Sequence, residues 1–314
     1  MIQSVLKSAG LQAALVESEW WTFFWITSIV TVIVLLVLAI ALKRGLGNAT
    51  IATSDDHRLH RYIALSGTLT VLILIGLLVR SVVTSRALAS ERVRNSDVTE
   101  IEVTAYQWWW SVEYQHPEPE QRVRTANELH IPVGRTVAIK LLASDVIHSF
   151  WVPSLAGKLD AIPGHEAVLW LRADQPGVYR GQCAEYCGFQ HAHMAFVVIA
   201  EAPDQFERWI QAQRTTAHQP QSDIEQRGLQ LVQRSACVMC HTIRGTAAGG
   251  RMGPDLTHYA SRSTIAAGTR PRTREHLIEW LTDPQAIKPG NRMPTLALSG
   301  DDRSAIAAYL EQLR

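Results

Sequence analysis

Charged residues and cysteines are both scarce in this sequence of 314 residues. Only 19% of the residues are Asp, Glu, Lys or Arg, whereas ordinary soluble domains have about 25%. The 30 basic and 29 acidic residues leave a net charge of +1, which argues against a nucleic-acid partner and against a disordered acidic tail. Four cysteines are too few for a secreted scaffold built on disulfides. They form two close pairs, Cys183/Cys187 and Cys237/Cys240, which indicates two separate metal or cofactor sites.

Two long stretches near the start of the chain are almost free of charge. The first covers residues 20–42, and the second covers residues 62–80, in which only Arg80 is charged. A helix needs about 20 apolar residues to cross a bilayer core, so both stretches predict transmembrane helices. The alternatives are a signal peptide for the first stretch and a buried core helix for the second. The first stretch lacks the basic leader and the small-residue cleavage site of a signal peptide.

The loop between these stretches predicts their orientation. It carries more basic than acidic residues: Lys43, Arg44, Arg58 and Arg61 against Asp55 and Asp56. The positive-inside rule therefore places the loop in the cytoplasm. Four arginines that follow on the other side count against this orientation: Arg80, Arg86, Arg92 and Arg94. We expect a two-span protein of the inner membrane of a bacterial-type cell, with both termini on the periplasmic side.

The pattern of apolar and polar residues changes twice along the rest of the chain. Short apolar runs between turn residues, as at 137–142, 167–171 and 195–200, predict strands of a sandwich or barrel. After a polar segment, Ser222 and Glu225 have the spacing of a helix-capping box, and helical patterns continue to the end. We therefore expect a multidomain protein with four parts: an N-terminal tail and transmembrane hairpin (1–96), a β domain (97–210), a linker (211–221) and an α domain (222–314).

The first cysteine pair lies in a segment rich in soft ligands. Cys183, Cys187, His191 and Met194 fall within twelve residues, and copper favours this combination of sulfur and imidazole. The four-residue spacing lets both thiolates point inward from one loop and bridge two copper ions. One further imidazole is needed, and His148, at the end of an apolar run, is the natural candidate. The alternatives are a structural disulfide and a zinc site.

The second pair belongs to the motif Cys237-Val-Met-Cys240-His241. C-x-x-C-H is the attachment motif of c-type haem, in which two thioether bonds hold the porphyrin and the histidine binds the iron. A methionine on the other side raises the potential into the range of electron transfer. Met252 and Met293 are both available for this position. The alternatives for the motif are a redox dithiol and a zinc knuckle.

Residues 20–210 resemble subunit II of haem–copper cytochrome c oxidases. The resemblance rests on the copper-type motif and on residues 107–114, 145–153 and 158–164. It implies a cupredoxin-like barrel on a two-helix membrane hairpin, with the binuclear copper centre called CuA. The ligands that it implies are His148, Cys183, Cys187, His191, Met194 and the backbone carbonyl of Glu185.

Two more residues acquire roles from this resemblance. The Glu185 carboxylate would face a magnesium ion shared with subunit I. Trp108 matches the aromatic residue through which an external cytochrome c delivers electrons in that family. The alternative is that it packs against the barrel or the membrane surface. One feature of the family is missing. Residues 55–62 lack the usual Glu at a proton-channel entrance before the second span, so the resemblance assigns no proton-channel residue here.

Residues 222–314 resemble small class I cytochromes c. In that family a Gly-Pro-x-Leu turn, here residues 253–256, supports the axial histidine, and an Asn-x-Met-Pro loop supplies the methionine. The resemblance therefore implies His241 and Met293 as the axial ligands, with Cys237 and Cys240 as the covalent attachment points.

Together the two resemblances imply subunit II of a cytochrome c oxidase with a fused haem c domain. Electrons would pass from a cytochrome c or another redox protein to haem c, then to CuA, then to subunit I, where oxygen is reduced and protons are pumped. The expected partners are subunit I, other oxidase subunits and the lipid membrane. A nitrous-oxide-reducing system would need a second, His-rich copper domain, and a copper chaperone has no use for covalent haem. A quinol oxidase subunit lacks the copper ligands.

The two soluble domains differ in net charge. Residues 97–210 contain 15 acidic and 8 basic residues, while residues 220–314 contain 9 acidic and 12 basic residues. Opposite charges favour an encounter between tethered domains. This pattern predicts electrostatic docking through an arginine cluster: Arg262, Arg270, Arg272 and Arg274.

Overall fold

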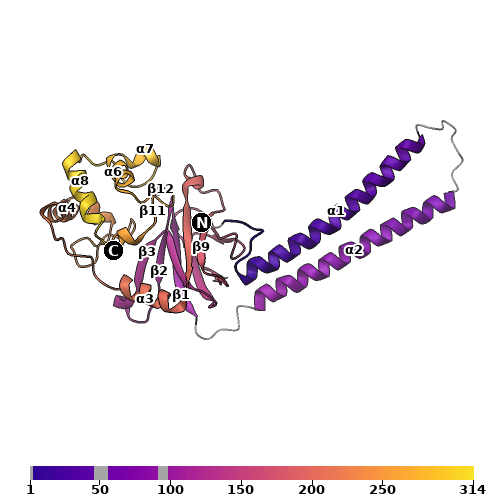
Figure 1. The fold of residues 1–314 in the computed structure, drawn as a ribbon, viewed down its shortest axis with the longest axis horizontal. Helices are drawn as coiled ribbons and strands as arrows, with labels where there is room; N and C mark the ends of the chain where they lie inside the picture. Colours follow the sequence, from indigo (N-terminus) through magenta and orange to yellow (C-terminus); the bar gives the residue numbers. More distant parts are fainter. Residues whose placement is uncertain (1–2, 46–55, 91–97) are drawn as a thin grey trace. The chain divides into compact units, whose positions relative to one another are not determined.

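The structure, a computed structural model, describes residues 3–45, 56–90 and 98–314 (Figure 1). The chain divides into two compact units. One unit comprises Met1–Ala13 and Asn95–Arg314, and the other comprises Ala14–Arg94. The second unit contains the two apolar helices, and the first contains both cysteine pairs.

The apolar unit is a pair of long helices, α1 (Leu11–Gly45) and α2 (Asp56–Ser90). Both are long and apolar enough to cross a membrane, with mean hydropathy of 2.8 and 2.3 in their most apolar windows. None of the residues in those windows is buried against other parts of the protein, as expected for side chains that face lipid. Arg80 and Glu19 form an ion pair of 3.2 Å that links the two helices. Of the residues used for the orientation, Asp55 in the loop and Arg92 and Arg94 after the second helix lie outside the described residues.

The β domain consists of two five-stranded sheets, in agreement with the cupredoxin-like fold expected from the sequence. One sheet has the order β3-β2-β1-β5-β8, and the other has the order β4-β10-β9-β6-β7. The parallel pairs β1/β5 and β4/β10 join strands that are distant in sequence. The strands are β1 (Thr99–Tyr106), β2 (Trp109–Tyr114), β3 (Val123–Ala126), β4 (Glu128–Pro132), β5 (Val137–Ala143), β6 (His148–Trp151), β7 (Leu159–Ala161), β8 (Ala167–Leu171), β9 (Gly177–Cys183) and β10 (Ala195–Glu201).

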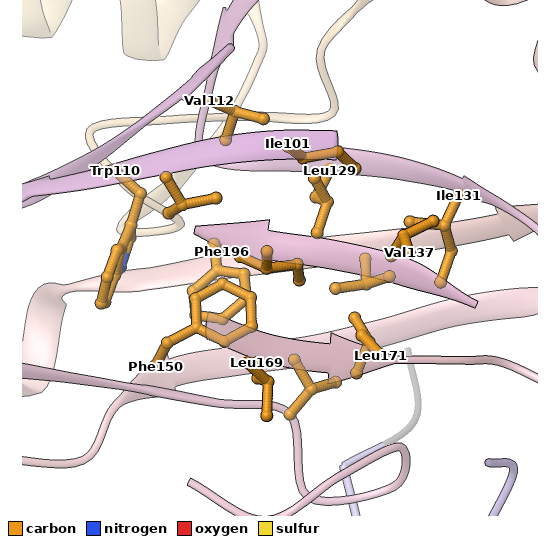
Figure 2. Close-up of a cluster of buried hydrophobic side chains, with 14 of the residues drawn as sticks. Ile101, Trp110, Val112, Leu129, Ile131, Val137, Phe150, Leu169, Leu171 and Phe196 are labelled. Atoms are coloured by element: carbon orange, nitrogen blue, oxygen red, sulfur yellow. The ribbon is translucent and has the colours of Figure 1, made fainter. Parts of the chain in front are cut away.

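The core lies between the two sheets and is filled by alternate side chains of their strands (Figure 2). On β1, for example, Ile101 and Val103 are fully buried, while the residues between them are more exposed. At one end of the core Trp110 packs edge-on against Phe150 and Phe196, with ring centroids 5.7 and 5.3 Å apart. This aromatic cluster lies next to the strands that carry the first cysteine pair, since Phe150 is on β6 and pairs with Cys183 on β9.

The C-terminal part is mainly helical. Helix α3 (Pro203–Gln213) still belongs to the β domain, because its Phe206 and Ile210 join the core of that domain. The helices of the C-terminal domain are α4 (Asp223–Arg234), α5 (Cys237–Cys240), α6 (Arg274–Thr282), α7 (Pro284–Ile287) and α8 (Gly300–Leu310). The side chains of Ser222, Thr273 and Ser299 cap α4, α6 and α8. A two-stranded ribbon, β11 (Thr264–Ile265) with β12 (Arg270–Pro271), adds strand structure that the purely helical expectation lacked. The ribbon forms because residues 266–268 turn the chain back with positive φ angles.

Helices α4 and α8 pack closely at Gly228. A Cβ atom at this position would meet the Ala305 carbonyl and would lie 2.8 Å from the Tyr309 Cβ. We therefore expect Gly228→Ala to destabilise the protein by about 1–3 kcal/mol, since overpacking outweighs the better helix propensity of alanine. Thermal unfolding followed by circular dichroism measures the effect. Gly300→Ala is the control, because its Cβ has open space. Equal stability of the two variants would contradict the close packing.

Candidate copper and haem centres

The first cysteine pair lies in a buried cluster at one end of the β domain. Cys183 ends β9, Cys187 follows in the next loop, and their sulfur atoms are 3.8 Å apart. The His148 Nδ1 atom lies 3.8 Å from the Cys183 sulfur, and the His191 Nδ1 atom lies 3.6 Å from the Cys187 sulfur. Each thiol therefore has its own imidazole neighbour.

Two further donors complete the cluster. The Met194 Sδ atom lies 3.8 Å from the Cys187 sulfur, and the Glu185 carbonyl oxygen lies 3.2 Å from the Cys183 sulfur. The structure thus brings together all six groups that the sequence associated with copper. The Glu185 side chain is partly exposed, and a magnesium ion at its carboxylate remains a prediction.

Neighbouring residues orient these groups. Asp145 Oδ1 lies 2.9 Å from His148 Nε2, which directs Nδ1 towards the thiols. Burial raises the pKa of Asp145, but hydrogen bonds from His148 and from the backbone N–H groups of Gln107 and Val146 outweigh it and hold the pKa below its usual value. Gln107 Nε2 also donates to the Cys187 carbonyl at 2.7 Å.

The two cysteine side chains influence each other's pKa across their 3.8 Å contact. Hydrogen bonding from Cys187 lowers the pKa of Cys183 to about 3, against the opposing effect of burial. The same contact, together with burial, raises the pKa of Cys187. Thiolates are the form of cysteine that binds metals, and buried sulfur and imidazole donors suit copper. This donor set fits the implied binuclear copper centre.

The second cysteine pair opens onto a cavity of about 440 Å³. Cys237, Cys240 and His241 all line it, because the one-turn helix α5 presents the two thiols and the histidine follows directly. His241 Nδ1 lies 2.8 Å from the Pro254 carbonyl oxygen, which leaves Nε2 available to a metal. Gly253 permits this approach, since a Cβ atom there would lie 2.8 Å from His241 Cε1.

Both candidate methionines also line this cavity, but their surroundings differ. Met252 is 65% exposed. Met293 is partly buried, and its sulfur accepts a hydrogen bond from Trp280 Nε1 at 3.1 Å. Asn291 Oδ1 accepts from the Met293 backbone N–H at 2.8 Å. These contacts hold Met293 in the cavity wall, whereas the Met252 side chain is largely exposed.

The cavity has the chemistry of a haem site. In the described part of the chain, two buried atoms that belong to its lining residues have no hydrogen-bond partner: Arg262 Nε and Tyr259 Oη. Arg262 is 8% exposed. Most other lining residues are apolar. A largely apolar cavity with two unpartnered buried donors suits a flat apolar molecule that carries carboxylates, as haem does.

Trp108 lies between the two centres. It is 6% exposed, and it lines the haem cavity from the side of the β domain. Its indole Nε1 donates to the carbonyl oxygen of Cys187 at 2.9 Å. One side chain thus contacts both the cavity and a residue of the copper cluster.

The arginine cluster that the sequence suggested for docking is divided in the structure. Arg262 is buried and interacts electrostatically with Glu128 of the β domain, whereas two other members bind within their own domain. Arg274 pairs with Glu311 of its own domain at 2.6 Å. Arg272 donates to the Arg262 carbonyl, also within its domain. Lys288 and Arg292 also reach the β domain, through a hydrogen bond to the Trp108 carbonyl and an ion pair with Asp145. Net charge counts charges without locating them, which is why the expectation included arginines that bind within their own domain. Electrostatic docking itself stays a prediction.

Sequence reasoning missed several residues around these centres. Asp145 had a signal, because it precedes His148 by three residues. Gln107 belongs to the motif at residues 107–114, and Arg262 was predicted for docking rather than for the cavity. Lys288 and Tyr259 had no signal, since their roles depend on contacts between segments far apart in the sequence.

Two family descriptions match the chain. "Cytochrome C oxidase subunit II, periplasmic domain" matches residues 117–201, and "Cytochrome c" matches residues 225–314. Cytochrome c oxidase subunit 2 of Alkalihalophilus pseudofirmus is 39% identical over 215 residues, which are 68% of this chain and 61% of that relative. Its counterpart in Bacillus sp. (strain PS3) is 32% identical over 260 residues, 78% of this chain and 72% of the relative. The solved periplasmic domain of subunit II of a Bradyrhizobium japonicum cytochrome oxidase is 29% identical, with a TM-score of 0.36 over 39% of this chain and 96% of that structure.

Proposed function

The chain belongs to the cytochrome c oxidase subunit II family, and on this premise we propose that it carries electrons from a donor to the oxygen-reducing subunit of a haem–copper oxidase. Electrons would enter at haem c, pass to CuA, and leave towards subunit I, where oxygen is reduced and protons are translocated. The observation that carries the proposal is the place of Trp108 between the haem cavity and the copper cluster.

Each cofactor has its own set of residues in this proposal. Cys237 and Cys240 hold haem c through thioether bonds, and His241 and Met293 bind its iron. CuA is held by His148, Cys183, Cys187, His191, Met194 and the carbonyl of Glu185. Bound there, the two metal centres supply one-electron redox chemistry. The protein's residues supply fixed positions, so that little rearrangement accompanies the transfer.

Trp108 is the bridge of this route. Its ring faces the haem cavity, and its indole N–H binds the carbonyl of Cys187, whose sulfur belongs to the copper cluster. Because Trp108 is buried beneath the chain's own haem domain, an external donor would deliver electrons to haem c. A cytochrome c or another redox protein fits this role.

The apolar hairpin anchors the protein in a membrane. We propose that both termini and both redox domains face the periplasm, in line with the basic loop between the helices. This side also suits covalent haem attachment and thiolate-bound copper. The partners are subunit I and other oxidase subunits, with a magnesium ion at Glu185 where the chain meets subunit I.

Substitution of Trp108 tests the route. Trp108→Leu removes both the ring and the hydrogen bond to Cys187, so we expect electron transfer from haem c to CuA to slow by about tenfold to 100-fold, as a small misplacement of reacting groups does. Trp108→Phe keeps an aromatic ring and should have an intermediate rate. Flash-induced transfer in the full chain, with both cofactors loaded, measures the rates. Trp170→Leu is the control, since Trp170 lies on β8, outside the cavity lining. A wild-type rate in Trp108→Leu would contradict the proposed route.

A further inference from the structure

Lys288 is a buried lysine at the junction of the two soluble domains. It follows α7 in the haem domain, and it is only 3% exposed. Its Nζ atom donates to the carbonyl oxygens of Trp108 at 2.7 Å, His193 at 2.7 Å and Ala266 at 3.1 Å. Trp108 and His193 belong to the β domain, whereas Ala266 lines the haem cavity. One side chain therefore binds Trp108, the loop that carries most of the copper-type donors (residues 183–194, here called the copper loop) and the wall of the haem cavity.

These contacts match the charged form of the side chain. An ammonium group has three N–H donors and no acceptor, and here three carbonyl oxygens accept from it. Among the described residues, no carboxylate lies within ion-pair distance of Lys288. Burial of this side chain, 3% exposed, disfavours its charge. A methionine or leucine would fill the same space without this cost.

The turn that Lys288 holds is strained. Ala266 and Ala267 have φ angles of 53° and 57°, a region that residues with a Cβ atom rarely adopt. Such conformations persist where surrounding contacts impose them. Lys288 binds the Ala266 carbonyl, and the backbone N–H of Ala195 in the β domain binds the Ala267 carbonyl at 3.0 Å. The strained turn is thus held against the strand that follows the copper loop.

Further contacts close the same junction. Gln190 Nε2 in the copper loop donates to the Pro289 carbonyl at 2.9 Å, next to Lys288. Arg292 lies 3.3 Å from Asp145, the carboxylate that orients His148. The segment from Lys288 to Met293 therefore joins the haem cavity to the copper cluster at several points.

We propose that Lys288 is a positioning residue for electron transfer between the two centres: its ammonium clamps the 266–268 turn onto the copper loop and fixes Trp108 between haem and copper. This inference rests on the proposed function. The step that it serves moves one electron and no proton, so that the reduced haem iron is oxidised and the oxidised copper pair is reduced. A clamped interface makes this transfer independent of diffusion of the tethered domain.

Lys288→Met tests the proposal, because it keeps the length of the side chain and removes its charge and donors. In the full chain with both cofactors, we expect haem-to-copper transfer to slow about tenfold or more and to become sensitive to solvent viscosity. The wild-type rate should be insensitive to viscosity. Lys288→Arg should recover part of the rate, since it restores a buried cation with several donors. Arg270→Met is the matched control for loss of a positive charge, because Arg270 is exposed and its one described hydrogen bond is to the adjacent Thr269 carbonyl.

Hydrogen–deuterium exchange gives a readout that does not depend on electron transfer. In Lys288→Met the Ala195 amide, which binds the Ala267 carbonyl across the junction, should exchange at least about tenfold faster. The Val197 amide, which binds the Asn127 carbonyl inside the β domain, should keep its protection. If Lys288→Met does not fold or load its cofactors, Lys288→Gln, which keeps two donors without the charge, undergoes the same measurements.

The outcomes are distinguishable. Faster Ala195 exchange together with slower, viscosity-dependent transfer supports the clamp. Unchanged exchange, or faster exchange with a wild-type rate, overturns the positioning role of Lys288. Absence of haem-to-copper transfer in the wild-type chain would refute the proposed function instead, and faster Ala195 exchange in the variant would still support Lys288 as the clamp.

Discussion

Replacing Cys183 or Cys187 with serine should remove both copper ions and leave the haem attached. The two sulfur atoms lie 3.8 Å apart, and each has an imidazole within 3.8 Å. Both thiolates therefore belong to one compact set of donors, and the loss of either one disrupts the whole proposed copper centre. A serine hydroxyl stays protonated at neutral pH and is a hard oxygen ligand, which suits copper poorly. The copper content, measured by mass spectrometry, should fall from two ions per chain to about none.

The same experiment contains its control. The haem absorption bands should not change, because Cys237 and Cys240 lie in a separate cavity. Met194→Leu should keep both copper ions and alter the spectrum and the rate of transfer, since a thioether is a weak ligand. Two copper ions and an unchanged near-infrared spectrum in Cys183→Ser would refute the copper assignment.

The copper cluster could be predicted because most of its donors are local. Cys183, Cys187, His191 and Met194 lie in one segment, and the short spacing between the cysteines already limits how far apart their sulfur atoms can be. Only His148 comes from elsewhere, on β6, which pairs with β9. The strands β5, β8 and β10 were predicted from the apolar runs at 137–142, 167–171 and 195–200, since a buried strand must carry apolar residues.

The junction between the soluble domains could not be predicted in this way. Lys288 contacts Trp108 across 180 positions of the chain, and no local pattern marks a lysine that will be buried. The arginines of residues 270–274 are closer together in sequence and suggested docking, yet Arg274 pairs inside its own domain. Composition reports how many charges a domain has, but the fold decides which of them reach the neighbouring domain.

The choice of Met293 over Met252 is an intermediate case. Both lie in the segment after the haem motif, and spacing alone left both open. The likeness to class I cytochromes c favoured Met293, and the structure adds a physical reason. Gln285 Nε2 donates to the carbonyls of Asn291 and Met293 at 2.8 and 2.9 Å, so the loop before α8 is fixed where the cavity needs a ligand.

Met293→Ala should therefore change the haem centre strongly, whereas Met252→Ala should not. Loss of the thioether removes the sulfur ligand of the iron, and the weak absorption band near the red end of the spectrum should disappear. The reduction potential should fall, because methionine ligation raises it and axial ligands set haem potentials over a range of about 0.8 V. Redox titration of the full chain, followed by visible absorption, measures both effects.

Two features of the cavity decide how this result is interpreted. Trp280 Nε1 binds the Met293 sulfur at 3.1 Å, so Trp280→Phe should leave the ligand in place but weaken its orientation, and it should shift the potential less than Met293→Ala does. Met252 is 65% exposed, so its loss should leave the band and the potential unchanged. Loss of the band in Met252→Ala, with its retention in Met293→Ala, would assign the ligand to the exposed methionine. That outcome would require Met252, which lines the same cavity, to turn its exposed side chain towards the iron when haem binds. Among the described residues, it is Met293 that hydrogen bonds from Trp280 and to Asn291 hold in the cavity wall.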